Sequence, residues 1–267
     1  MQPDELKQVM VGGRSIAYRT HGDGPPLILL HGFLCDSRCW RTQMTSLARQ
    51  FTVVAWDAPG AGFSPDPTDD FTIADWAEVL AAFLDALGVG RANVLGLSWG
   101  GMLAQELYRL HPGRIERLVL ADTYAGWKGS LPADVVEKRR ARCYRDASRP
   151  RREVVDDWVP VEFFANASAE LAAEMAEVVS DFHPLGFRLM ARSLADTDTT
   201  SVLRTITVPT LLLWGDEDQR SPLSVAEQFH SVIRGSILIV IRGAGHVSNM
   251  ERPDDFNAHV RRFLTER

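Results

Sequence analysis

Short apolar runs alternate with longer amphipathic segments along most of the chain. Six runs are typical of strands buried on both faces, namely "PLILLHG", "FTVVAWD", "ANVLGLS", "RLVLADT", "PTLLLWG" and "SILIVIRG". Between the second and third runs, apolar side chains recur at helical spacing from Ile73 to Leu87, after a Thr72 and Asp75 start signal and before Gly88. Parallel strands need such crossovers, so the pattern predicts a mostly parallel sheet flanked by helices.

Further elements are predicted toward the two ends of the chain. The segment "QVMVGGRSIAYRTHG" alternates around a Gly-Gly turn, which predicts an antiparallel hairpin at a sheet edge. Ser221 with Pro222 is expected to start one late helix, and Pro253 the last one.

One region breaks the alternation. Residues 125–205 contain no strand pattern, only helical spacings such as that of Leu171, Met175, Val178 and Phe182. We therefore expect a core of residues 1–124 and 206–267, with residues 125–205 inserted between two strands as a helical cap. The insertion is predicted to lie over the carboxyl ends of the strands, where open α/β sheets bind ligands.

Composition excludes several classes of partner. The net charge is −6, and positive and negative residues are mixed along the 267 residues. The sequence therefore lacks the excess of basic residues that is typical of nucleic-acid-binding proteins. The start has no basic segment followed by an apolar one, and no run reaches about 18 apolar residues, which predicts a cytoplasmic protein without a membrane span. Cys35, Cys39 and Cys143 are sparse and odd in number, which favours free thiols over disulfides or a metal site. Nothing indicates an oligomeric state.

The segment "GLSWG" places Ser98 between two glycines, after a predicted strand and before a predicted helix. A Gly and Ser turn is the ordinary interpretation of such a pentapeptide. The strand-turn-helix context favours a strained turn that exposes a nucleophilic hydroxyl.

A serine nucleophile needs a base and a group that orients the base. Of the seven histidines, only His246 lies in a Gly-rich loop directly after a strand, in "IRGAGHVSNMERP". Asp218, in "LLLWGDEDQRSP", is the preferred acid. Asp122, which ends the preceding strand, stays open as a competitor.

Two backbone N–H groups are expected to stabilise an oxyanion. Trp99 follows the predicted nucleophile and supplies the first. Phe33, in the loop after "LILLHG", supplies the second, and His31 is expected to hold this loop through side-chain hydrogen bonds.

These motifs together resemble enzymes of the α/β-hydrolase fold. The similarity extends over "LHGF" at 30–33, "DAPGAGFS" at 57–64, "GLSWGG" at 96–101, "GDED" at 215–218 and "GAGHVSNMERPDDF" at 243–256. It points to the esterase, lactonase and non-haem haloperoxidase-like branch, and the motifs are similar to those of 3-oxoadipate enol-lactonases and carboxylesterases. The resemblance implies a triad of Ser98, Asp218 and His246, in that chain order. An aspartate at position 98 would instead indicate a dehalogenase or an epoxide hydrolase.

The sequence thus predicts a hydrolase of carboxylic esters or lactones that works through an acyl-enzyme, without cofactor or metal. Two alternatives stay open: hydrolysis of a C–C bond in a diketone ring-cleavage product, and a non-enzymatic receptor for small molecules. Several apolar side chains in or next to the cap are candidates for an apolar roof over the substrate: Tyr124, Trp127, Trp158, Phe163, Phe164, Phe182, Phe187 and Met190. Arg188 and Arg192 either bind a substrate carboxylate or belong to a solvated helix face.

Overall fold

Eight strands form one sheet in the computed structural model, which describes residues 5–266. Their order across the sheet is β1-β2-β4-β3-β5-β6-β7-β8. The hairpin of β1 and β2 is antiparallel and pairs antiparallel with β4, and all other neighbours are parallel. The strands are β1 (Leu6–Val11), β2 (Arg14–His21), β3 (Pro26–Leu30), β4 (Thr52–Trp56), β5 (Ala92–Leu97), β6 (Ile115–Ala121), β7 (Thr210–Gly215) and β8 (Ile237–Ile241).

Burial follows the position of each strand in the sheet. Every residue of β5 and β7 is buried, because helices cover both faces of the central sheet. The expectation of full burial is wrong for β8, where Ile237 is 47% and Val240 38% exposed. This strand lies at the edge of the sheet, next to β7 alone, so neighbouring strands and helices cover less of it.

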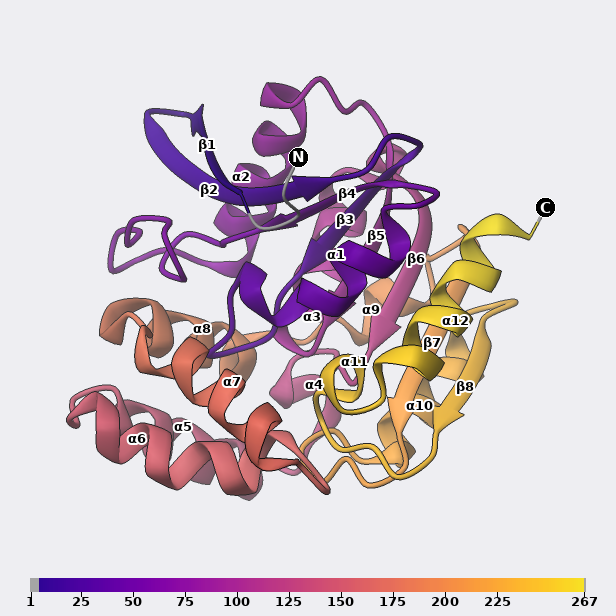
Figure 1. Ribbon diagram of the computed structural model, residues 1–267. Helices are drawn as coiled ribbons and strands as arrows, with labels where there is room; N and C mark the ends of the chain where they lie inside the picture. Colours follow the sequence, from indigo (N-terminus) through magenta and orange to yellow (C-terminus); the bar gives the residue numbers. More distant parts are fainter. Residues whose placement is uncertain (1–4, 267) are drawn as a thin grey trace.

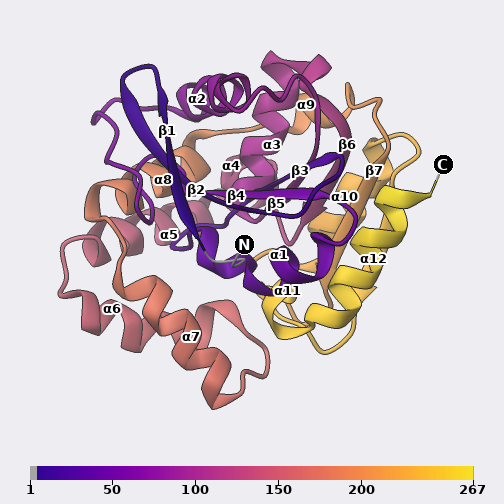
Figure 2. The ribbon, with the colours of Figure 1, turned by 45° about the horizontal axis from the view of Figure 1, so that its top comes forward.

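The helices lie in two layers around the sheet (Figures 1 and 2). Helices α1 and α12 pack together on one side, and α2 and α3 on the other. The predicted capping box is present: the Thr72 side chain accepts from the backbone of Asp75, and the Asp75 side chain from that of Thr72. The helices outside the inserted region are α1 (Arg41–Leu47), α2 (Ile73–Ala86), α3 (Trp99–Leu110), α10 (Leu223–Val232), α11 (Ser248–Glu251) and α12 (Pro253–Thr265), with short 3-10 turns η1 (Ser37–Trp40) and η2 (Pro112–Arg114).

Between β6 and β7 the described chain forms helices and loops, as predicted. The helical segments are α4 (Trp127–Ser130), α5 (Ala133–Asp146), α6 (Arg151–Trp158), a π-helical turn η3 (Val159–Phe163), α7 (Ala169–Ser180), α8 (Pro184–Asp196) and α9 (Thr200–Leu203). Helices α5 to α8 gather at one end of the sheet in both views (Figures 1 and 2). Phe182, predicted to share a helix with Leu171, lies in the turn between α7 and α8.

Within residues 5–266, no helix combines the length and apolarity needed to cross a membrane. The same part of the chain contains no group of three or more His, Cys, Asp or Glu side chains that could hold a metal ion. The three cysteines are buried and form no disulfide.

Candidate active site

Ser98 lies at a strained turn between β5 and α3. Its backbone has φ +52° and ψ −117°, a region that side-chain-bearing residues rarely adopt. The glycines on either side are required by space. A Cβ on Gly96 would lie 2.4 Å from the carbonyl oxygen of Gly100, and one on Gly100 would lie 2.2 Å from that of Leu30. The predicted nucleophile turn is therefore present, with glycine where backbone passes closest.

His246 connects Ser98 to Asp218. Its Nε2 lies 2.8 Å from Ser98 Oγ, and its Nδ1 lies 2.8 Å from Asp218 Oδ2. The ionised carboxylate only accepts hydrogen bonds, so it favours a proton on Nδ1 and leaves Nε2 free to accept the serine proton. All three side chains are buried, which limits competition from water.

The second oxygen of Asp218 is held by backbone. Oδ1 accepts hydrogen bonds from the N–H groups of Arg220 at 2.8 Å and Ser221 at 2.9 Å. These donors come from the loop that follows β7, so the loop itself fixes the carboxylate and directs Oδ2 to His246.

Asp122, the competing acid, directly follows β6 and does not bond to His246. Its Oδ1 accepts from the N–H of Gly215 at 2.8 Å and its Oδ2 from the hydroxyl of Ser248 at 2.5 Å. Full burial, and secondarily the charge of Asp218, raises the pKa of Asp122 well above its ordinary value. Asp122 therefore ties the end of β7 to Ser248, which opens α11 directly after the loop that carries His246.

His31 orients the predicted Phe33 donor. Its Nδ1 donates to the carbonyl of Gly32 at 2.9 Å, and its Nε2 accepts from the N–H of Ala58 at 3.0 Å. The Gly32 carbonyl and the Phe33 N–H belong to one peptide plane, so the first bond fixes the direction of the second group. Burial lowers the pKa of His31, which favours the neutral tautomer that this pattern needs.

The Phe33 loop lies next to the nucleophile at Gly32. A Cβ built on Gly32 would lie 3.4 Å from the Cβ of Ser98. Trp99 opens α3 directly after Ser98. Within residues 5–266, neither the Phe33 nor the Trp99 backbone N–H donates a hydrogen bond. Two N–H donors therefore remain available beside Ser98.

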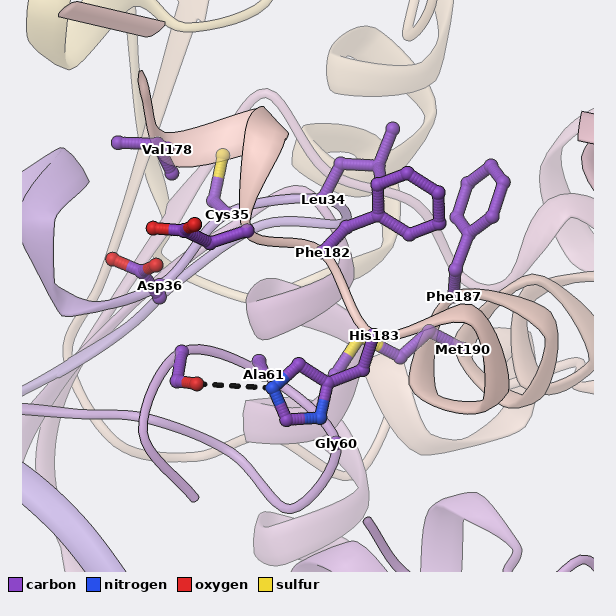
Figure 3. A pocket seen from close by; sticks show the side chains of 12 residues that line it. Leu34, Cys35, Asp36, Gly60, Ala61, Val178, Phe182, His183, Phe187 and Met190 are labelled. Carbon is purple, nitrogen blue, oxygen red and sulfur yellow. Dashed lines mark hydrogen bonds between the residues drawn. The ribbon is translucent and has the colours of Figure 1, made fainter. Parts of the chain in front are cut away.

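Aromatic rings surround the Phe33 side chain. Its ring centroid lies 4.8 Å from that of Phe187, 5.9 Å from Trp158 and 6.4 Å from Trp127. Phe187 also lines a narrow pocket between the loops 34–36 and 60–62 and the start of α8 (Figure 3). The inserted helices thus place an apolar wall beside the Phe33 loop.

Half-buried charges that were not predicted lie against Trp158 of this aromatic wall. The guanidinium groups of Arg142 and Arg220 lie 4.5 Å and 5.4 Å from the ring centroid of Trp158, and both pair with Glu162. Burial opposes ionisation of Glu162, but the charges of Arg220 and Arg142 outweigh it and lower its pKa. Helix α5 therefore directs the charge of Arg142 toward Trp158 and Glu162.

Arg188 and Arg192 face a surface loop instead of the predicted site. Arg188 pairs with Asp69 at 2.9 Å, and Arg192 donates to the carbonyls of Asp69 and Phe71 at 2.8 and 3.0 Å. Both arginines hold the loop before α2. The structure therefore favours a solvated helix face over the binding of a substrate carboxylate.

A mostly parallel sheet with a serine at a strained strand-to-helix turn defines the class of the α/β hydrolases. The chain belongs to this family, whose model, described as alpha/beta hydrolase fold, matches residues 25–253.

Three solved structures are similar over nearly the whole chain. An esterase from Thermogutta terrifontis is 27% identical with a TM-score of 0.88, and the match covers 97% of this chain and 98% of that one. The enol-lactonase from Burkholderia xenovorans LB400 is 27% identical with a TM-score of 0.87, covering 97% and 100%. A hydrolase from Pseudomonas aeruginosa PA01 is 31% identical with a TM-score of 0.88, covering 98% and 99%. The expected similarity to esterases and lactonases is thereby confirmed.

Proposed function

We propose that the protein is a cofactor-independent serine hydrolase that cleaves carboxylic esters or lactones through an acyl-enzyme. The observation that carries the proposal is the continuous hydrogen-bonded chain from Ser98 Oγ through His246 to Asp218, with 2.8 Å at each of its two contacts. The similarity to an esterase and an enol-lactonase supports ester and lactone substrates.

In the acylation step, Ser98 Oγ attacks the carbonyl carbon of the substrate while His246 Nε2 takes the hydroxyl proton. Asp218 keeps Nε2 free for this proton and stabilises the imidazolium that forms. The N–H groups of Phe33 and Trp99 donate to the oxygen on which negative charge develops, and donors already oriented in a dry site need little reorganisation.

The intermediate then collapses and His246 returns its proton to the leaving oxygen, which departs as an alcohol or, for a lactone, stays attached to the acyl group. In deacylation, a water molecule loses a proton to His246 and attacks the acyl carbon. The second collapse releases the carboxylic acid and restores the Ser98 hydroxyl.

We assign the roof of the substrate site to a cap formed by residues 125–205, over a core of residues 1–124 and 206–267. The wall of Trp127, Trp158 and Phe187 around Phe33 supports this assignment. Aromatic side chains bury large apolar areas, which favours substrates with an apolar acyl or aryl group.

The test is a panel of aryl esters and lactones of graded chain length, assayed with the unchanged protein, Ser98→Ala and a control, Ser231→Ala. Ser231 is exposed on α10, so its variant should retain full turnover. Loss of a triad nucleophile costs on the order of 10⁶ in kcat, and a serine-directed phosphonate should label only the peptide that carries Ser98. Turnover by Ser98→Ala within about tenfold of the unchanged protein would contradict the mechanism, since the nucleophile dominates such triads. Ligand binding without multiple turnover would favour a receptor.

A further inference from the structure

A buried carboxylate next to the His246 loop has backbone partners from two distant parts of the chain. Glu251, the last residue of α11, is 8% exposed. Its Oε2 accepts from the N–H of Gly245 at 2.6 Å and of Ala165 at 3.3 Å, and its Oε1 from the N–H of Asn166 at 2.6 Å. Within residues 5–266, Glu251 pairs with no Lys or Arg. These three N–H donors therefore replace the water that the buried carboxylate would otherwise bind.

The donors lie on both sides of a junction. Gly245 directly precedes His246, whereas Ala165 and Asn166 follow the π-helical turn η3 of the inserted region. The N–H of Val247 also donates to the carbonyl of Phe163 at 3.1 Å. The inserted segment therefore bonds to the main chain immediately before and after His246, in part through Glu251.

No side chain fits between the two segments. A Cβ built on Gly245 would lie 2.5 Å from the nitrogen of Ala165. Backbone packs directly on backbone here, so a shift of the segment 163–166 must be transmitted to the loop 244–247.

The same inserted segment also contacts the loop of the acid. Glu162 pairs with Arg220, whose backbone N–H donates to Asp218 Oδ1 at 2.8 Å. The stretch 162–166 thus touches both loops that carry partners of Ser98. A π-helical turn is uncommon and is often found at functional sites.

We propose that Glu251 is a positioning residue, which holds the segment 163–166 on the loop 244–247 and thereby keeps His246 Nε2 within reach of Ser98 Oγ. The inference rests on the proposed function. Two charge-assisted bonds of 2.6 Å, one to each segment, make the carboxylate a bridge between them. When these bonds are lost, the His246 imidazole is expected to move away from Ser98 Oγ, although the His246 side chain itself is unchanged.

Glu251→Gln is the sharpest variant because it preserves shape. An amide has one acceptor oxygen, so its NH₂ group must oppose either the N–H of Asn166 or those of Gly245 and Ala165. In either case one of the two 2.6 Å bonds is lost, and the connection between the two segments is weakened. Since a displacement of about 1 Å at a reacting group can cost 10²-fold, we expect kcat for a neutral aryl ester to fall about 10- to 100-fold. KM should change less than about threefold, because the substrate contacts remain and only the chemical step is affected. The rate of phosphonate labelling at Ser98 should fall by the same factor as kcat.

The matched control is Glu106→Gln. Glu106 is also buried, pairs with Arg109 on α3 and touches none of the three triad residues. It should lose stability without loss of kcat. A merely structural role of Glu251 would make the two variants behave alike.

Amide hydrogen exchange on the folded variants tests the coupling itself. In Glu251→Gln, peptides covering 163–167 and 243–247 should lose protection together, whereas in Glu106→Gln both should stay protected. Unchanged kcat and labelling rate in Glu251→Gln, or loss of protection in one peptide alone, would overturn the inference. Failure of the unchanged protein to hydrolyse any ester would instead contradict the proposed function, and the exchange experiment would still decide whether Glu251 couples the two segments.

Discussion

Asp218 reaches Nδ1 of His246 across 2.8 Å, and backbone N–H groups hold its other oxygen. Asp122, at the end of the neighbouring strand, is equally buried but bonds to Gly215 and Ser248. Two carboxylates at adjacent strand ends therefore have separate partners, and only one of them meets the imidazole.

Asp218→Asn should reduce kcat by about 10⁴ with little change in thermal stability. The amide oxygen can still accept from Arg220 and Ser221, but the NH₂ group faces Nδ1 and forces the imidazole proton onto Nε2. The imidazole then cannot accept the Ser98 proton. Steady-state kinetics and thermal unfolding measure the two effects. Asp216→Asn is the control, because within residues 5–266 this exposed neighbour accepts a hydrogen bond only from the N–H of Gly243. A loss below about tenfold in Asp218→Asn would reassign the acid, since an orienting carboxylate contributes far more.

Asp122→Asn should alter the pH dependence of stability instead of kcat. The raised pKa means that, between about pH 4 and that pKa, the folded state holds a proton that the unfolded state has lost. Asp122 therefore lowers the free energy of unfolding as pH rises through this window. An asparagine does not titrate, keeps its bond from Gly215 and can donate to the Ser248 hydroxyl, so the variant should gain stability relative to the unchanged protein as pH rises. Urea unfolding at several pH values measures this difference. A free energy of unfolding of the variant that falls with rising pH relative to that of the unchanged protein would contradict the argument.

His31→Gln should change the pH dependence of stability in the direction opposite to that of Asp122→Asn. The pKa of His31 is lowered in the folded state, so between that pKa and about 6.5 the unfolded state binds more protons. The contribution of His31 to stability is fully present above about pH 6.5 and is lost as pH falls through the folded pKa. A glutamine oxygen can accept from Ala58 without titrating, so the stability advantage of the unchanged protein should shrink toward acid. A constant difference in unfolding free energy across the same pH range would show that His31 is not the titrating group.

Gly100→Ala should destabilise the protein and reduce kcat together. The added Cβ would lie 2.2 Å from the Leu30 carbonyl oxygen, so the turn that holds Ser98 or strand β3 must move. Overpacking of this kind costs about 1 to 3 kcal/mol or more. Gly113→Ala is the control, because no atom lies within 4 Å of its Cβ position. Equal melting temperatures and activities for the two variants would refute the steric argument.

Local patterns predicted the sheet well because each strand is a short apolar run with a turn or helix signal on either side. The sequence could group Ser98, Asp218 and His246 because each follows such a run, and the ends of parallel strands meet at one edge. The structure places these three side chains in hydrogen-bond contact. The exposure of Val240 was missed, since strand order decides which run lies at an edge. Glu251 and Arg220 were missed for a similar reason: their partners, Asn166 and Glu162, are far away in the chain and lie in a region without a clear pattern.

The inserted region leaves the sheet at the end of β6 and returns at the start of β7, which pair directly as neighbours, with Leu120 opposite Leu212. Loop-closure entropy grows only slowly with the length of the loop that is closed. The stability of the sheet therefore depends little on how many helices lie between these two strands. The inserted region can change in length or be replaced as a unit during evolution. The contacts of residues 162–166 are among those that limit this freedom, because an exchanged segment would have to reproduce the same bonds to keep the histidine loop in place.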